Sequence, residues 1–304
     1  MQFGVNLLNF GPGVSPSVLL RTALIAESLG YHFAMICDHV AITDEVGKRY
    51  PEPFYDPYAT LSWLAGQTKQ IKLGTTVIVV PYRNPVLMAR LGANLDHLSG
   101  GRFIFGVGAG NARTEFDALG VPFHRRGAIT DEYLAAIKAL WTSKTASFKG
   151  LYVNLQDVSG IDTLQKPHPP IWVGGSSDAA LKRAVLFGEA WHPIRATLDW
   201  LRNSALPTIR RFAEESQRPV PALAPRIRLA VTATTQPEET RQVGEGTNDQ
   251  VRRDLEALGS LGASHVLFDW YTGDLEATRR HESEWSMLAL LADQVLNLEK
   301  QALR

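Results

Sequence analysis

Short apolar runs, several of them rich in β-branched residues, alternate along the chain with longer stretches of helical periodicity. The apolar runs predict strands at residues 3–8, 33–37, 71–80, 102–107, 170–173, 190–192, 227–232 and 265–268. The stretches between them predict helices at residues 16–29, 58–68, 86–98, 131–141, 178–187, 198–215, 249–259 and 276–298. The chain therefore consists of eight predicted strand-then-helix units.

This order of elements indicates an α/β fold in which parallel strands are covered by helices. Eight such units within 304 residues are the number that closes a (β/α)8 TIM barrel. A doubly wound open sheet is the competing architecture, and we favour the barrel. No shift of composition and no sequence repeat divides the chain, so we expect a single domain over residues 1–304.

Three connections are unusually long: residues 38–57 follow the second strand, residues 111–130 follow the fourth, and residues 148–169 form an insertion before the fifth. The first two lie after strands, at the face where barrel enzymes hold their active sites. The third follows a helix, and its sequence SFKGLYVNL predicts a hairpin or an extended arm. Residues 99–102, SGGR, precede a strand, at the opposite face, where such features serve stability.

Charge and composition narrow the class of protein. Lys plus Arg and Asp plus Glu both number 31, so the formal net charge is zero. Nucleic acids and anionic membranes are bound chiefly through surplus cations, so we expect neither as a partner. The single cysteine, Cys37, excludes an intramolecular disulfide and a cysteine-rich metal site. Since no apolar run approaches the ~20 residues of a membrane span and no signal-peptide pattern opens the chain, we expect a cytoplasmic protein.

Asp38 and His39 stand where the second predicted strand ends. In a barrel, a polar pair at this end of a strand faces the mouth of the active site, and histidine titrates near physiological pH. The alternative is a loop histidine capped by its neighbour, and the sequence does not separate the two. The chain contains no HExxH or HxH spacing of metal ligands, so we expect no metal site.

Two glycine-rich strand ends are candidate ligand sites. Residues 106–111, GVGAGN, lack the third glycine of a dinucleotide-binding fingerprint and come too late in the chain for one, which weakens a Rossmann interpretation. Their alternating glycines permit the close approach of a flat ligand. Residues 173–178, VGGSSD, end a strand and begin a helix, which predicts an anion site made of backbone N–H groups and the helix dipole. An ordinary turn with Ser177 as helix N-cap is the alternative.

Longer motifs give the chain a family resemblance. The stretches AESLGYHFAMICDHV, LGTTVIVVPYRNPVLMARLGANLDHLSGGRFIFGVGAG, EFDALGVPFHRRG, DEYLAAIKALW and KPHPPIWVGGSS occur in this order within residues 1 to about 195. They resemble the bacterial luciferase-like monooxygenase superfamily of flavin- or deazaflavin-dependent barrel oxidoreductases, and most of all its F420-dependent branch. The resemblance implies a (β/α)8 barrel, in agreement with the eight units, and the last third of the chain fits it by pattern only.

The resemblance also implies roles for individual residues. Asp38 and His39 match the pair beside the cofactor ring, where both are expected to be catalytic, with His39 as the acid or base of hydride transfer and Asp38 also binding the cofactor. The other positions implied to bind the cofactor are Thr76, Val77, Gly108, Gly110, Asn111, Val173, Gly174, Gly175, Ser176 and Ser177. Asn111 departs from the Trp or Glu that is frequent there, which puts the substrate and the acid catalyst at this position in doubt.

Thr76 and Val77 match the bulge of the third strand that backs the ring in the family. We therefore expect a non-proline cis peptide between Thr76 and Val77, and the alternative is a plain bulge with all-trans bonds. A planar ring needs convex support at the mouth of a barrel, and a cis bond shortens the Cα–Cα step and turns the strand outward.

The function implied by the resemblance is an F420-dependent oxidoreductase that transfers a hydride between the deazaflavin and a small organic substrate. An FMN-dependent monooxygenase that uses reduced flavin and O2 is the alternative, and a ligand carrier without chemistry is a third. The resemblance also implies a homodimer. The helices expected at residues 58–68 and 86–98 are poor in charge, as the cores of interfaces are.

Overall fold

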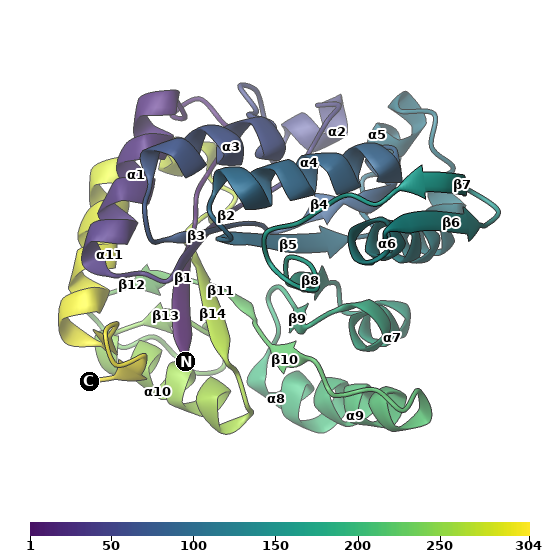
Figure 1. Cartoon of the computed structure of the whole chain (residues 1–304). Helices are drawn as coiled ribbons and strands as arrows, with labels where there is room; N and C mark the ends of the chain where they lie inside the picture. The colour runs from purple at the N-terminus through teal and green to yellow at the C-terminus, as the bar shows by residue number, and fades with distance from the viewer.

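The computed structural model describes residues 1–304, the side chain of Ala277 excepted, and is built on one curled sheet (Figure 1). Neighbouring strands in the order β10-β9-β8-β5-β3-β2-β1-β14-β11 pair in parallel, and β4 pairs with β5. The strands are β1 (Gln2–Asn6), β2 (Phe33–Ile36), β3 (Lys72–Thr75), β4 (Ile78–Val79), β5 (Phe103–Gly108), β8 (Ile171–Gly174), β9 (Ala190–His192), β10 (Ala222–Leu223), β11 (Arg226–Arg228) and β14 (His265–Asp269). The predicted α/β fold with a parallel sheet is confirmed.

The two ends of this sheet lie in one short segment of the chain. β10 pairs with β9, and β11, which follows after Ala224 and Pro225, pairs with β14. The Ala224 N–H donates to the Trp191 carbonyl, and the Leu267 N–H donates to the Pro225 carbonyl. Backbone hydrogen bonds therefore join this segment to both sides of the sheet.

Helices cover the outer face of the sheet (Figure 1). They are α1 (Pro16–Leu29), α2 (Asp44–Gly47), α3 (Pro57–Gln67), α4 (Pro85–Leu98), α5 (Arg113–Ala118), α6 (Arg126–Thr142), α7 (Asp178–Phe187), α8 (Leu198–Trp200), α9 (Leu206–Glu215), α10 (Asn248–Ser260) and α11 (His281–Gln294). Ser15, Asp56 and Asn84 cap α1, α3 and α4 through their side chains, and each is followed by proline at the first helical position. In the part of the chain that the structure describes, no helix has the length and apolarity needed to cross a membrane.

Strand residues inside the curl form a core of their own. The ring centroids of Phe33 on β2 and Trp172 on β8 lie 5.3 Å apart, although β3 and β5 separate these two strands in the sheet. The contact therefore crosses the interior, where Met35, Ile104 and Leu267 belong to the same buried cluster. This packing fills the curl below the carboxyl ends of the strands and leaves those ends to form a site.

Two predicted strands differ from the observed ones. The strand expected at residues 71–80 is divided into β3 and β4 at Thr76 and Val77, whose peptide bond is cis, as predicted. The strand expected at residues 227–232 begins one residue earlier, at Arg226, and ends at Arg228. Pro225, which has no N–H to donate, separates it from β10. Its expected end forms β12 (Ala230–Val231), which pairs with β13 (Glu245–Gly246) outside the main sheet.

Two predicted helices are also interrupted. The helix expected at residues 198–215 contains a π-helical turn at Leu201–Ala205, just before Pro207, which cannot donate a backbone hydrogen bond. The helix expected at residues 276–298 is a 3-10 turn (Leu275–Arg279) followed by α11, and the antiparallel strands β15 (Leu296–Asn297) and β16 (Ala302–Leu303) follow it. Residues between α6 and β8 contain the antiparallel hairpin of β6 (Thr145–Lys149) and β7 (Asn154–Ser159).

Candidate functional site

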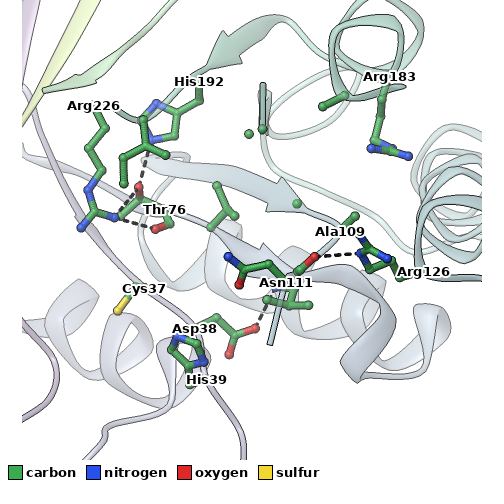
Figure 2. A pocket seen from close by; sticks show the side chains of 18 of the residues that line it. Cys37, Asp38, His39, Thr76, Ala109, Asn111, Arg126, Arg183, His192 and Arg226 are labelled. Atoms are coloured by element: carbon green, nitrogen blue, oxygen red, sulfur yellow. Dashed lines mark hydrogen bonds between the residues drawn. The ribbon is translucent and has the colours of Figure 1, made fainter. Parts of the chain in front are cut away.

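A cavity of about 340 Å³ lies at the carboxyl ends of the parallel strands (Figure 2). The predicted site residues that line it are Asp38, His39, Thr76, Val77, Gly108, Gly110, Asn111, Gly174, Gly175 and Ser177. Two predicted residues lie elsewhere: the Val173 side chain is fully buried in the main core, and Ser176 is exposed outside the cavity lining. Parallel strands thus bring residues from distant parts of the sequence to one opening.

Close contacts leave little or no room for a side chain at Gly108, Gly174 and Gly175. A Cβ on Gly108 would lie 2.7 Å from Cγ2 of Val77, and a Cβ on Gly174 would lie 3.2 Å from Cγ1 of the same side chain. Gly175 has a φ of +105°, and a Cβ there would lie 2.8 Å from that of Ala180. The glycines therefore make room for Val77 and for the turn into α7, in addition to lining the cavity.

At one end of the cavity, His192 and Arg226 hold Thr76 (Figure 2). His192 Nδ1 lies 2.5 Å from the Ala224 carbonyl, which can only accept, so Nδ1 carries the hydrogen. Nε2 then accepts from the Thr76 hydroxyl at 2.9 Å. Burial lowers the pKa of His192 to about 4, so the ring is neutral near pH 7 and both of its nitrogens are engaged.

Arg226 brings a fixed positive charge to the same end. Its Nη1 donates to the Thr76 carbonyl at 3.0 Å, and its Nη2 lies 2.7 Å from an Asp269 carboxylate oxygen. Burial disfavours the charged form of Arg226, but the nearby Asp269 carboxylate favours it, and the pKa of Arg226 is raised above its usual range. Cys37 also lines this end, and burial raises the pKa of its thiol to about 12, so it remains protonated and unreactive.

Two further arginines, Arg126 and Arg183, line the opposite end, beside the turn into α7 (Figure 2). Arg126 Nε donates to the Gly110 carbonyl at 3.1 Å. Arg183 is buried, and its Nε lies 2.5 Å from an Asp131 carboxylate oxygen, which fixes the guanidinium in the wall of the cavity. The cavity therefore has a cationic end next to the glycine turn that the sequence predicted as an anion site.

Asp38 forms an ion pair with Arg83. Arg83 donates to both Asp38 oxygens, at 2.7 and 2.8 Å, and the Val79 N–H donates to one of them at 2.9 Å. Arg83 also binds Asp56, the N-cap of α3, at 2.8 Å. Burial raises the pKa of Asp38, and the Arg83 guanidinium opposes that rise. Asp38 thus ties the end of β2 to the end of β4 and the start of α3.

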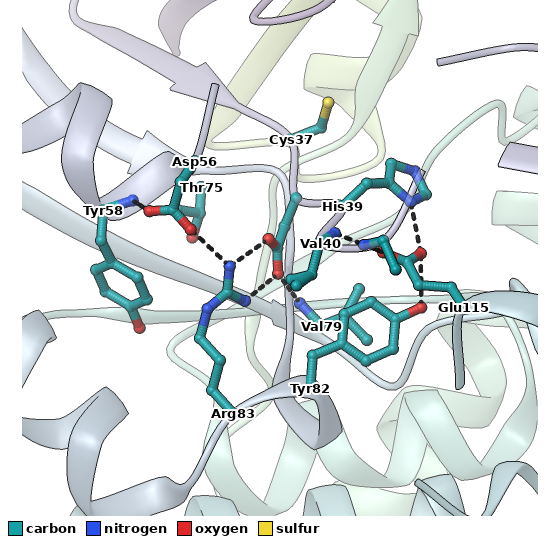
Figure 3. Close-up of polar contacts among 12 residues, drawn as sticks. Cys37, His39, Val40, Asp56, Tyr58, Thr75, Val79, Tyr82, Arg83 and Glu115 are labelled. Atoms are coloured by element: carbon teal, nitrogen blue, oxygen red, sulfur yellow. Dashed lines mark hydrogen bonds and ion pairs between the residues drawn. The ribbon is translucent and has the colours of Figure 1, made fainter. Parts of the chain in front are cut away.

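His39 is arranged differently from its neighbour. Its Nδ1 lies 2.8 Å from a Glu115 carboxylate oxygen, and its side chain lines the cavity with 14% of its surface exposed (Figure 3). The Tyr50 ring stacks on the imidazole, with centroids 4.7 Å apart. Because Glu115 holds Nδ1, Nε2 is the ring nitrogen available to a ligand in the cavity.

The cavity residues that the sequence did not reveal have signals of unequal strength. Arg183 lies in the helix predicted at residues 178–187, six positions after Ser177, and no motif marked it as a site residue. To place His192 and Arg226 in the cavity, one must know the bounds and register of β9 and β11, and the bounds of β11 were predicted incorrectly. Glu115, which lies behind the cavity lining, begins the stretch EFDALGVPFHRRG that carries the family resemblance, but its contact with His39 spans 76 positions and left no local signal. Among the described residues, no group of three or more His, Cys, Asp and Glu could hold a metal ion.

Residues 1–291 match the family model described as luciferase-like monooxygenase. The chain belongs to the luciferase-like monooxygenase family. A relative in this family, the F420-dependent glucose-6-phosphate dehydrogenase of Kineococcus radiotolerans, is 32% identical over 209 residues, 67% of this chain and 60% of that protein. An uncharacterized protein of Mycobacterium tuberculosis is 30% identical over 188 residues, 58% of this chain and 66% of that protein. The chain thus matches at most about two thirds of the length of these relatives.

Solved structures support the luciferase-like fold over nearly the whole chain. Monooxygenase RslO1 from Streptomyces bottropensis has a TM-score of 0.78 and 21% identity, with 99% of this chain and 100% of that chain covered. An F420-dependent secondary alcohol dehydrogenase in complex with an F420-acetone adduct has a TM-score of 0.76 and 19% identity, with 94% and 98% covered. At these identities the likeness shows the fold alone.

Proposed function

We propose that this protein is an F420-dependent oxidoreductase that transfers a hydride between the deazaflavin and a small organic substrate. The observation that carries the proposal is His39, which lines the cavity and keeps Nε2 available, whereas His192 uses both ring nitrogens. Relatives of the chain named F420-dependent glucose-6-phosphate dehydrogenase, at 32% and 29% identity, support this cofactor over others.

The residues present fit a cofactor that combines a flat ring with a phosphate. Arg126, Arg183 and the Gly174–Gly175 turn would hold the phosphate at the cationic end. Thr76 and Val77 would support the ring, and Gly108 would allow it to approach the backbone. For the fold, the same proposal takes the curled sheet as a closed (β/α)8 barrel. In this barrel β3 and β4 together count as one strand, and so do β10 and β11.

A bound deazaflavin supplies a carbon that takes or returns a hydride, and it does not activate oxygen readily. The protein then has to orient the substrate and move one proton. His39 moves this proton. Its Nε2 accepts the proton of a substrate hydroxyl as the neighbouring carbon gives up its hydride, and in the opposite direction Nε2 returns the proton to the oxygen. Asp38 acts indirectly, by fixing the end of β2 through Arg83.

The proposal is tested by assaying the purified protein with F420 and a panel of alcohols and sugar phosphates without oxygen, and with reduced F420 and carbonyl compounds. We expect substrate-dependent loss or recovery of the visible absorbance of oxidised F420. Oxygen consumption with reduced FMN, and no reaction with F420, would assign the chain to the FMN-dependent monooxygenases instead.

A further inference from the structure

Glu115 is a fully buried carboxyl group on α5, directly behind His39. A buried carboxyl without partners is costly, so its contacts indicate its role. Its two oxygens contact His39 Nδ1 at 2.8 Å, the Tyr82 hydroxyl at 2.9 Å, the Val40 N–H at 2.5 Å and the Ala41 N–H at 3.1 Å (Figure 3). The side chain is therefore surrounded by donors from two separate segments, residues 39–41 and Tyr82.

These donors require an ionised carboxylate. The N–H groups of Val40 and Ala41 can only donate, so the oxygen that they share accepts twice and carries no hydrogen. The Tyr82 hydroxyl donates to the other oxygen, and the pKa of Tyr82 is raised by burial, so this group keeps its proton. Burial would raise the pKa of Glu115, but His39 and the two backbone N–H groups together hold it below its usual value.

An ionised Glu115 decides which nitrogen of His39 carries a hydrogen. The carboxylate can only accept, so Nδ1 must be the donor at 2.8 Å in both the neutral and the charged ring. The proton exchanged with a ligand then enters and leaves at Nε2. Tyr50, stacked on one face, and Phe54, edge-on at 5.6 Å, restrict rotation of the ring about this hydrogen bond.

Two other charged groups lie near His39. Asp38, its neighbour in the chain, is paired with Arg83. The Arg49 guanidinium lies over the ring of Tyr50, 5.9 Å from the ring centroid. Of the groups around the imidazole, Glu115 is thus the anion that bonds to it directly.

We infer that Glu115 is a positioning residue for the proton transfer of His39: it fixes the Nδ1–H tautomer and the orientation of the ring, so that Nε2 faces the substrate. This inference rests on the proposed function for its catalytic consequence, but the tautomer itself does not depend on which reaction the protein performs. The arrangement is that of an acid–base histidine oriented by a buried carboxylate.

The first experiment compares Glu115→Gln with Glu132→Gln. Glu132 is the matched control, because it also accepts backbone N–H groups, those of Leu151, Tyr152 and Val153, and lies outside the cavity lining. We expect kcat of Glu115→Gln to fall by about 10²- to 10⁴-fold, as when an orienting carboxylate or its base is removed. The dissociation constant of Glu115→Gln for F420 and the kcat of Glu132→Gln stay within about twofold of wild type.

The second experiment measures the tautomer directly, by ¹⁵N NMR of histidine-labelled wild-type protein, with His39→Gln used to assign the signal. We expect the neutral ring of His39 to carry its hydrogen on Nδ1, and Glu115→Gln to mix the two tautomers. A wild-type His39 that carries its hydrogen on Nε2 when neutral, or a Glu115→Gln variant with an unchanged kcat, would overturn the inference. The wild-type spectrum tests the tautomer of His39 even if Glu115→Gln does not fold. If the protein does not turn over F420 but His39 carries its hydrogen on Nδ1, only the proposed function is refuted.

Discussion

At the scale of single residues, adjacent side chains have different roles. Asp38 and His39 were predicted together from their place after a strand, with both expected to be catalytic, His39 as the acid or base and Asp38 also as a cofactor ligand. The division depends on partners far along the chain: Arg83 lies 45 positions after Asp38, and Glu115 lies 76 positions after His39. A motif reveals that a strand end is polar, but only the packed structure shows which side-chain atoms remain available.

Replacing His39 tests its proposed role in proton transfer. We expect His39→Gln to lower kcat by about 10²- to 10⁴-fold, because the positioned acid–base group is lost, while the dissociation constant for F420 changes little. His97→Gln, at a half-exposed histidine on α4, serves as the control and should retain wild-type kcat. Steady-state kinetics and a fluorescence titration of each variant provide the measurements, and a His39→Gln enzyme of normal kcat would remove His39 from the mechanism.

The buried neutral His192 predicts a pH dependence of stability. Its pKa is about 4 in the folded protein against 6.5 for an ordinary histidine, so the unfolded chain binds a proton more readily. The stabilisation is complete above pH 6.5 and is lost as the pH falls from there towards 4. Between pH 7 and pH 5, His192 should account for about 2 kcal/mol of the unfolding free energy.

This contribution is measured by urea unfolding of wild type and His192→Gln at both pH values. The variant cannot titrate at this position, so its free energy of unfolding should fall less between pH 7 and pH 5. His265, whose pKa is also lowered to about 4 by burial, contributes equally to both proteins and cancels in the comparison. Equal pH dependence in the two proteins would show that His192 is not buried as a neutral ring.

At the scale of elements, the strand ends that carry the site were predicted best where apolar runs were continuous. β2, β5, β8 and β9 agree with their predictions within about one or two residues, and they supply His39, Gly108 and Gly174. The strand with Arg226 was predicted one residue too late and four residues too long, because Ala230 and Val231 belong to a different sheet. Pairing between distant strands, which sets this register, leaves no local signal in the sequence.

Arg102 shows the opposite case, an element junction whose stabilising role was predicted. Its guanidinium donates to Ser99 O, Ala65 O, Thr68 O, Thr68 Oγ1 and Ile71 O, at 2.6 to 3.1 Å. The side chain therefore ties the ends of α3 and α4 to the start of β3, at the face remote from the cavity. We expect Arg102→Ala to lower the free energy of unfolding by about 2–4 kcal/mol, because several carbonyl groups lose a charged donor.

Thermal and urea unfolding measure this loss, and kcat/KM at a temperature where the variant stays folded provides the second readout. A purely structural role leaves kcat/KM within about twofold of wild type. An Arg102→Ala enzyme that is stable but slow would contradict the separation of a stabilising face from a catalytic face.

At the scale of the whole molecule, the helices α3 and α4 present apolar side chains to solvent. Trp63 on α3 is 38% exposed, and Leu87 and Leu98 on α4 are 51% and 63% exposed. We propose that this surface forms the interface of a homodimer, as the family resemblance implies. Exposed apolar groups on charge-poor helices are typical of such interfaces.

The assembly is measured by light scattering after size exclusion at micromolar concentration. We expect twice the mass of one chain for wild type and the mass of one chain for Leu87→Glu, because a buried unpaired charge opposes association. Val220→Glu, at an apolar residue that is 50% exposed away from these helices, should remain dimeric. A wild-type protein with the mass of one chain would exclude the dimer.

The central claim, a deazaflavin bound between His39 and the cationic end of the cavity, is tested most directly by titrating the protein with F420 and, separately, with FMN. Fluorescence or calorimetry should show saturable binding of F420 at one molecule per chain and weaker binding of FMN. Arg183→Gln should weaken F420 binding at least about tenfold, because a buried cation beside the phosphate is lost, whereas Arg211→Gln, at an exposed arginine on α9, should bind as wild type does. Tighter binding of FMN than of F420, or F420 binding that is indifferent to Arg183, would contradict the claim.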